Sequence, residues 1–259
     1  MFKIPENKPQ VPKDTPRNFF IYGETMSGKS FLANEFPNPF IINTDGNSQA
    51  NSVPSYQLYN HKDKNGKITK SVTEQLGEII LAFQTQKHDY ETLVIDVIDV
   101  IDDVVDMISF AIQNANGVDS LGDIPFGKGY AMQKDFLKQM ASDLKQLPMN
   151  VIYISRVDEK FDDKGNVSKV EPSLHKKHFN IFNGNCDLMI LTEKIGRNYT
   201  REVSRKRKNY YSEQVDDKNI LKILQTIDGA VINGSDPELK KISKTEVTTE
   251  ANTTEKEIF

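Results

Sequence analysis

The stretch that decides the fold is GETMSGKS, residues 23–30, which directly follows the short apolar run FFIY at 19–22. Its glycines, lysine and serine match the phosphate-binding pattern Gly, four free positions, Gly-Lys and Ser or Thr. Glycines let the backbone curl until successive N–H groups point at an anion, and the following helix adds its positive dipole end. FFIY predicts a strand and SFLANE at 30–35 predicts the start of a helix, which is the context that this loop requires.

The loop motif assigns a chemical task to each of its residues. Lys29 is expected to reach the β- and γ-phosphates of ATP, and the Ser30 hydroxyl is expected to ligate Mg²⁺. The alternative interpretation is a glycine-rich turn with a chance lysine. The predicted nucleotide-binding residues are Gly23, Glu24, Thr25, Met26, Ser27, Gly28, Lys29, Ser30 and Phe31.

Composition narrows the class of protein. The chain has 259 residues and a net charge of −4, which excludes a uniformly basic nucleic-acid coat but allows a local basic groove. One cysteine excludes an intramolecular disulfide framework and a cysteine-cluster metal site. The N-terminus is polar and proline-rich, unlike a signal peptide, and no apolar run approaches 18 residues. We therefore expect a cytoplasmic protein without a membrane partner.

Strand-like and helix-like segments alternate along the chain. Strands are expected at 19–22, 40–43, 56–59, 93–96, 151–155, 188–191 and 201–203, and helices at 72–86, 101–112 and 136–147. The alternation predicts an α/β fold with a mainly parallel sheet and helices on both faces. We expect one ATPase domain over 17–234, between a flexible segment at 1–16 and a disordered acidic tail at 235–259.

Acidic residues at strand ends are the candidates for metal and water chemistry. Asp96 ends the apolar run TLVID and is predicted to support Mg²⁺, whereas Asp99 is interpreted mainly as the cap of the next helix. Asp45, at the end of FIINTD, is a candidate for positioning the attacking water. Because Asp45-Gly46 is also ordinary turn chemistry, the residues alone leave both interpretations of Asp45 open.

The order of these motifs resembles a known superfamily. FIINTDGN at 40–47 is similar to the acidic turn of RecA-superfamily recombinases. The succession P-loop, FIINTDGN, ETLVIDVID, GKGYAMQKDF, NVIYIS, LHKKHFNIFNGNCDLMIL and SRKRKNYY resembles a phage-encoded group of compact RecA-like P-loop ATPases, over residues 17–215. That group is associated with single-strand DNA annealing and recombination.

The resemblance implies roles for particular residues and partners. It implies that Lys29, Asp45 and Asp96 are catalytic, with Asp45 in place of the family's water-activating Glu, and that Ser155 or Arg156 is a polar sensor. The Asp45 side chain is one methylene shorter than the Glu of the family. The resemblance therefore leaves the hydrolysis rate open, because a catalytic group misplaced by about 1 Å can cost around a hundredfold in rate. It also implies ATP and Mg²⁺ as cofactors, a homo-oligomer, and single-stranded DNA as a partner.

A basic run with interleaved tyrosines is the candidate for DNA contact. Three interpretations remain open: a DNA-binding groove in which Tyr199, Tyr210 and Tyr211 stack on bases, an arginine finger toward the ATP of a neighbouring subunit, and a solvated strand end. The residues concerned are Arg201, Arg205, Lys206, Arg207 and Lys208.

Three functions remain compatible with the sequence. They are a DNA-dependent ATPase that assembles on single-stranded DNA, a P-loop kinase for a small molecule, and a nucleotide-dependent switch with little turnover. The tail ends in EKEIF, an acidic segment with a terminal aromatic. It is interpreted either as a solubilising tail or as a peptide that docks on host replication or recombination proteins, as the tip of single-stranded DNA-binding proteins does.

Overall fold

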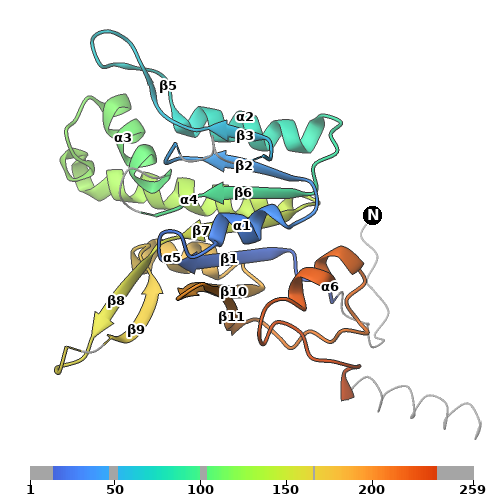
Figure 1. Ribbon diagram of the computed structural model, residues 1–259. Coiled ribbons are helices and arrows are strands. Elements are labelled where there is room, and N and C mark those ends of the chain that lie inside the picture. Colours follow the sequence, from blue (N-terminus) through green and yellow to red (C-terminus); the bar gives the residue numbers. More distant parts are fainter. Residues whose placement is uncertain (1–13, 47–51, 100–103, 166, 238–259) are drawn as a thin grey trace, which may run out of the picture.

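The computed structural model describes residues 14–46, 52–99, 104–165 and 167–237, and their centre is a seven-stranded sheet (Figure 1). The strand order is β11-β10-β1-β7-β6-β2-β3, and all neighbours are parallel except β10 and β11. The strands are β1 Asn18–Gly23, β2 Pro39–Asn43, β3 Ser55–Gln57, β6 Thr92–Asp96, β7 Asn150–Ser155, β10 Leu188–Ile195 and β11 Asn198–Lys206.

Helices cover both faces of this sheet, and two hairpins lie outside it (Figure 1). The core on one face includes residues of α2, α3, α4 and α5, and the core on the other includes residues of α1 and α6. The helices are α1 Lys29–Asn34, α2 Val72–Thr85, α3 Val104–Asn116, α4 Lys128–Gln146, α5 Lys176–Asn183 and α6 Lys218–Leu224. The hairpins are β4 His61–Lys62 with β5 Ile68–Lys70, and β8 Val157–Phe161 with β9 Val167–Pro172.

Burial on both faces explains why the central strands are continuous apolar runs. In β1, Phe20 and Tyr22 belong to the core under α2–α5, whereas Phe19 and Ile21 belong to the core under α1 and α6. A strand between two layers of helices has no solvated face and therefore needs no alternating polar residues. The expected α/β fold with a mainly parallel sheet is confirmed.

Several elements differ from the expectation. The polar stretch after β7 forms the hairpin β8–β9, whose charged residues gave no apolar strand signal because the hairpin projects from the sheet (Figure 1). Helix α4 begins at Lys128, ahead of the apolar periodicity, because Gly127 takes the left-handed conformation (φ 67°) that allows the chain to turn into the helix. Helices α5 and α6 were not predicted.

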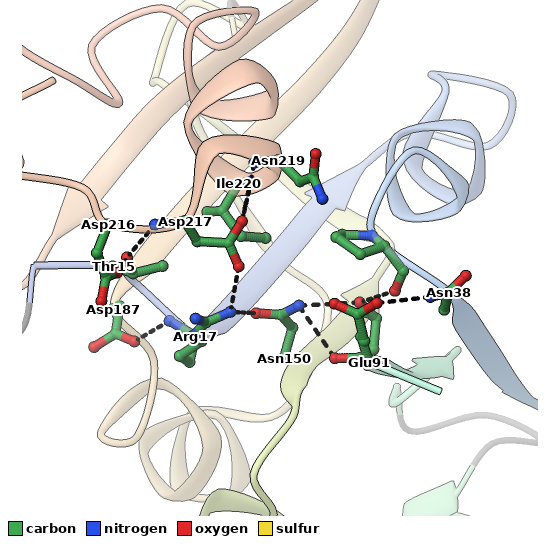
Figure 2. Close-up of polar contacts among 12 residues, drawn as sticks. Thr15, Arg17, Asn38, Glu91, Asn150, Asp187, Asp216, Asp217, Asn219 and Ile220 are labelled. Atoms are coloured by element: carbon green, nitrogen blue, oxygen red, sulfur yellow. Dashed lines mark hydrogen bonds and ion pairs between the residues drawn. The ribbon is translucent and has the colours of Figure 1, made fainter. Parts of the chain in front are cut away.

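The amino ends of the strands are joined by a polar network (Figure 2). Arg17 donates from Nη1 to Asn150 Oδ1 and to Asp217 Oδ2, both at 3.0 Å. Asn150 in turn donates to the carbonyl of Glu91 and to Thr92 Oγ1, both at 3.1 Å. This network ties together the segments that enter β1, β6, β7 and α6, at the edge opposite the P-loop.

The described fold starts before residue 17. Asp14 is buried and pairs with Lys208, and the Thr15 hydroxyl donates to Asp216, so both residues contact the described fold. The rest of the expected flexible segment, residues 1–13, and the tail from 238 onward lie outside the described residues. Within the described part, no helix combines the length and apolar character needed to cross a bilayer.

Candidate nucleotide site

The P-loop connects β1 to α1 at the carboxyl edge of the sheet. Gly28 has a φ of 94° at the N-cap of α1, a conformation that suits glycine, and Met26 also has a positive φ of 64°. Gly23 is required for a different reason: a Cβ there would lie 2.2 Å from the carbonyl oxygen of Thr192 on β10. The two glycines of the motif therefore provide a left-handed turn and a close approach of two backbones.

Lys29 is held inside the loop. Its ammonium donates to the carbonyl oxygens of Gly23 at 2.7 Å and of Glu24 at 2.5 Å, and the side chain is buried. Burial lowers the pKa of Lys29, and the nearby carboxylates of Asp96 and Asp99 oppose that shift. The loop thus holds the cation of Lys29 against its own backbone carbonyl oxygens.

Ser30 and Asp96 meet as the sequence predicts. The Ser30 hydroxyl donates to Asp96 Oδ2 at 2.7 Å, which joins the start of α1 to the end of β6. Asp96 is buried, and this burial raises the pKa of its carboxyl group, against the lowering effect of the Ser30 hydrogen bond. A hydroxyl and a carboxylate are hard oxygen ligands of the kind Mg²⁺ prefers, so these two residues fit the expected metal.

Asp99 is not simply a helix cap, contrary to the preferred interpretation. Its carboxylate accepts hydrogen bonds from the Ser155 hydroxyl and, at 2.6 Å, from the backbone N–H of Arg156. The buried Asp99 carboxylate therefore links the segment after β6 to the end of β7 by two hydrogen bonds. Burial raises the pKa of the Asp99 carboxyl group, and these hydrogen bonds oppose the shift.

Asp45 lies at the same edge, beyond the end of β2. Asn43 donates to Asp45 Oδ1 at 3.2 Å, and Arg156 Nη2 lies 4.0 Å from Asp45 Oδ2. The neighbouring Thr44 hydroxyl exchanges two hydrogen bonds of 2.9 Å with the backbone of Val97, which fixes the turn after β2 against the segment after β6.

A cavity of about 170 Å³ brings the predicted catalytic residues together. Lys29, Asp45 and Asp96 all line it, so three residues from three separate strand ends face one small charged space. Thr25, Ser30 and Arg156 are its other polar lining residues. Asp45 thus belongs to the turn with Gly46 and also lines the cavity. Its role in hydrolysis stays a prediction.

The basic run is largely paired within the molecule. Arg201 makes a two-pronged ion pair with Glu35, with hydrogen bonds of 2.7 and 2.5 Å, and Arg207 donates to the carbonyls of Gly184 and Cys186. Lys208 pairs with Asp14. Lys206 lies 3.5 Å from the carbonyl oxygen of Gly229, and Arg205 lines a cavity beside the β8–β9 hairpin.

The tyrosines near the basic run do not share one surface. Tyr210 is 2% exposed, so it cannot stack on a DNA base in this fold, and that part of the prediction is wrong. Tyr199 is 56% exposed but its ring lies over the P-loop, because a Cβ on Gly28 would be 3.3 Å from its Cδ1 atom.

Sequence reasoning missed the contribution of β10 to the site. Thr192 shares a hydrogen bond of 2.7 Å with Ser27, so the strand on the far side of β1 supports the loop. The available signal was a polar residue at the end of the apolar run LMIL, the same signal that identified Asp96 at the end of β6.

A mainly parallel sheet with a Lys-containing glycine loop after an inner strand, and a buried Asp on a second strand facing that loop, defines a P-loop nucleoside triphosphatase. The AAA domain family matches residues 15–216, and the chain belongs to this family of P-loop ATPases. No curated protein matches the chain significantly.

Proposed function

We propose that this protein binds ATP with Mg²⁺ at the P-loop, hydrolyses it, and uses the cycle to act on single-stranded DNA as a homo-oligomer, in recombination or annealing. The observation that carries the nucleotide part is the Ser30–Asp96 hydrogen bond beside the buried ammonium of Lys29. Together these groups offer a cation for phosphate oxygens and a hydroxyl–carboxylate pair for the metal.

The residues that line the site have separate roles in the transfer of the phosphoryl group to water. Lys29 neutralises charge on the β- and γ-phosphates, and the loop N–H groups hold the phosphates in place. When bound, Mg²⁺ supplies further neutralisation of the phosphate charge, with Ser30 and Asp96 as its protein-side partners. Asp45, oriented by the Asn43 amide, accepts a hydrogen bond from the attacking water, and Arg156 lies beside it to contact the γ-phosphate.

A cavity beside the nucleotide site supports the DNA part of the proposal. It measures about 940 Å³ and lies between the β8–β9 hairpin, α5 and β11. Asp99 and Arg156 line it, and Arg156 also lines the small charged cavity, so the two spaces share a wall. Its basic residues outnumber its acidic ones: Arg156, Lys160, Lys169, Lys176 and Arg205 against Asp99, Asp158 and Glu171. Such a surface suits a phosphodiester backbone.

Phosphate release from ATP, measured with and without single-stranded DNA, tests the proposal. We expect release that requires Mg²⁺ and rises when single-stranded DNA is added. Transfer of the phosphoryl group to a small acceptor would support a kinase instead, and tight ATP binding without release would support a switch. Both results would contradict the proposed cycle.

Two arginine variants of the β10–β11 region sharpen this experiment. Arg205 lines the hairpin cavity, whereas Arg197 is exposed in the turn between β10 and β11. We expect Arg205→Ala to lower the stimulation by DNA and the salt dependence of DNA binding, and Arg197→Ala to change neither. Equal effects of the two variants would show that the cavity beside the β8–β9 hairpin is not the DNA-binding surface.

Asp45→Asn tests the assignment of the water-positioning group. The amide is nearly isosteric but is a poorer acceptor of the water proton, so ATP binding should be retained while turnover falls about a hundredfold or more. Calorimetric ATP titration and single-turnover phosphate release separate the two steps. Parental turnover in this variant would return Asp45 to the role of a turn residue.

A further inference from the structure

The β4–β5 hairpin, residues 61–70, carries a local excess of positive charge. It holds four lysines and one aspartate, in a chain whose net charge is −4. Residues 62–67 at its tip are all exposed. Figure 1 shows this hairpin and the β8–β9 hairpin projecting at opposite ends of the sheet, and the cavity beside β8–β9 is lined by other segments. The basic hairpin is therefore a separate surface.

Part of the charge of the hairpin is balanced within the molecule. Lys70 pairs with a glutamate of α2 at 2.6 Å. The Asp63 carboxylate accepts hydrogen bonds from the backbone N–H groups of Asn65 at 2.8 Å and Lys67 at 2.9 Å, which fixes the turn. Within the part of the chain that the structure describes, the ammonium groups of Lys64 and Lys67 have no hydrogen bond or ion pair. These two cations are available to an external anion.

The base of the hairpin is fixed to two helices. Asn60 donates from Nδ2 to the carbonyl of Met107 on α3 at 2.8 Å, and its Oδ1 accepts from the N–H of Val72 on α2 at 2.9 Å. On the second strand, the N–H of Ile68 donates to Asn114 Oδ1 of α3 at 3.2 Å. Because the backbone is tied down in this way, less conformational freedom is lost when a ligand binds to the hairpin.

Aromatic rings lie beside the lysines. The Lys62 ammonium lies 4.2 Å from the centroid of the Phe110 ring, which is 39% exposed. Tyr59 is 48% exposed and stacks on His61, with the ring centroids 4.4 Å apart. Cations for phosphates beside rings for bases are the combination that binds single-stranded nucleic acid. An anionic membrane fits less well, because residues 63–67 at the tip include no apolar side chain to insert into lipid.

We propose that the β4–β5 hairpin is a second contact for single-stranded DNA, in which Lys62, Lys64 and Lys67 bind backbone phosphates and Tyr59 stacks on a base. The proposal rests on the proposed function for the identity of the partner, but it places that partner at the other end of the sheet from the cavity beside β8–β9. Two separate contacts on one subunit can hold two strands, or two parts of one strand, as a pairing reaction requires.

Binding of a labelled single-stranded oligonucleotide without ATP, at a series of salt concentrations, tests the role of the lysines. The double variant Lys64→Ala/Lys67→Ala should bind about tenfold more weakly at low salt. Its slope of log affinity against log salt should be shallower by about 1.4, because two phosphate contacts are lost. The matched control is Lys134→Ala/Lys138→Ala, which removes the same charge from exposed positions of α4 and should keep the parental affinity and slope.

A tyrosine variant tests the choice of single strands. Tyr59→Ala should weaken binding of the single strand about fivefold or more and leave binding of a duplex of the same sequence unchanged, because paired bases offer no free face for stacking. Tyr59→Phe should bind the single strand like the parent. Equal losses for single strand and duplex in Tyr59→Ala would contradict single-stranded DNA as the partner.

Three other results would overturn the hairpin contact. They are parental affinity and salt slope in the hairpin double variant, equal losses in the hairpin and α4 double variants, and a parent that binds anionic vesicles through these lysines but not the oligonucleotide. The proposed function is tested separately by phosphate release. If single-stranded DNA fails to stimulate release in the parent while the hairpin double variant still loses binding, the proposed cycle is wrong and the hairpin contact stands.

Discussion

Burial disfavours the charged form of the two carboxylates beside the P-loop, Asp96 and Asp99. Asp96 and Asp99 are 7% and 2% exposed, and burial raises the pKa of each carboxyl group because water no longer solvates the charge. The lysine in the loop and the hydroxyls of Ser30 and Ser155 offset part of that cost. A site that concentrates charge in this way is stabilised when a metal and a phosphate group bind.

Asp96→Asn should stabilise the metal-free, nucleotide-free protein at neutral pH. The folded-state pKa of Asp96 lies above its ordinary value of 3.8, so its contribution to stability is present below pH 3.8 and is lost as pH rises through the raised pKa. Asparagine never carries the charge. Urea unfolding should therefore give the variant a higher unfolding free energy than the parent at pH 7.5, with a difference that shrinks as pH is lowered.

The control for this experiment is Asp135→Asn, at an exposed position of α4. We expect it to change the unfolding free energy little at either pH, because the side chain is solvated. A variant Asp96→Asn that is less stable than the parent at pH 7.5 would show that the charged carboxylate contributes net stability, contrary to this account.

At the scale of elements, β10 braces the P-loop from one side and β6 from the other. The Thr192 hydroxyl bonds Ser27, and the Thr192 carbonyl fills the space where a side chain on residue 23 would lie. The opposite contact is the Ser30–Asp96 hydrogen bond. The loop is thus held between two strands, whose contacts fix the position of its backbone.

Gly23→Ala tests this bracing. The new Cβ would meet a backbone oxygen at 2.2 Å, and a backbone atom cannot move aside as a flexible side-chain end can. We expect a lower melting temperature and loss of ATP binding, measured by thermal unfolding and calorimetry. Gly77→Ala, in the exposed face of α2 with no atom within 4 Å of its Cβ, should instead stabilise by about 0.5–1 kcal/mol. Parental ATP affinity in Gly23→Ala would contradict the bracing.

Elements buried on both faces were predictable, and projecting elements were not. FFIY and TLVID identify β1 and β6, because a strand between two helical layers has to be apolar throughout. The hairpin β8–β9 lacks that constraint, so its sequence resembles a polar loop. Roles for Lys29, Ser30 and Asp96 could be assigned from local motifs. The hydrogen bonds of Asp99 could not be predicted, because its partners lie 56 and 57 residues away.

At the scale of the whole molecule, the predicted catalytic residues and the polar network around Arg17 lie at opposite edges of the sheet. The carboxyl ends of β1, β2, β6 and β7 carry the P-loop, Asp45, Asp96 and Ser155, whereas the amino ends carry the network around Arg17 and Asn150 (Figure 2). Asn150 is 1% exposed, and its amide bonds Arg17 before β1 and the adjacent residues Glu91 and Thr92 at the start of β6. Stability and nucleotide binding should therefore respond separately to substitutions at the two edges.

Asn150→Ala should destabilise the fold by about 1–3 kcal/mol, because it leaves buried polar partners without their hydrogen bonds. ATP affinity measured well below the melting temperature should stay parental, since the substitution lies at the far edge. Asn219→Ala is the matched control, because Asn219 is exposed at the start of α6 near the same network, and it should change stability by less than about 0.5 kcal/mol. Loss of ATP affinity in Asn150→Ala at low temperature would show that the two edges are coupled.

The most direct test of the central claim, that the P-loop is the ATP-hydrolysing site, is Mg²⁺-dependent phosphate release by Lys29→Ala. Loss of the cation that the loop holds against Gly23 and Glu24 should abolish release and strongly weaken ATP binding, because the charge on the β- and γ-phosphates is no longer neutralised. Lys134→Ala, at an exposed position of α4, should release phosphate at the parental rate. Release by Lys29→Ala at a rate close to that of the parent would contradict the assignment of the P-loop.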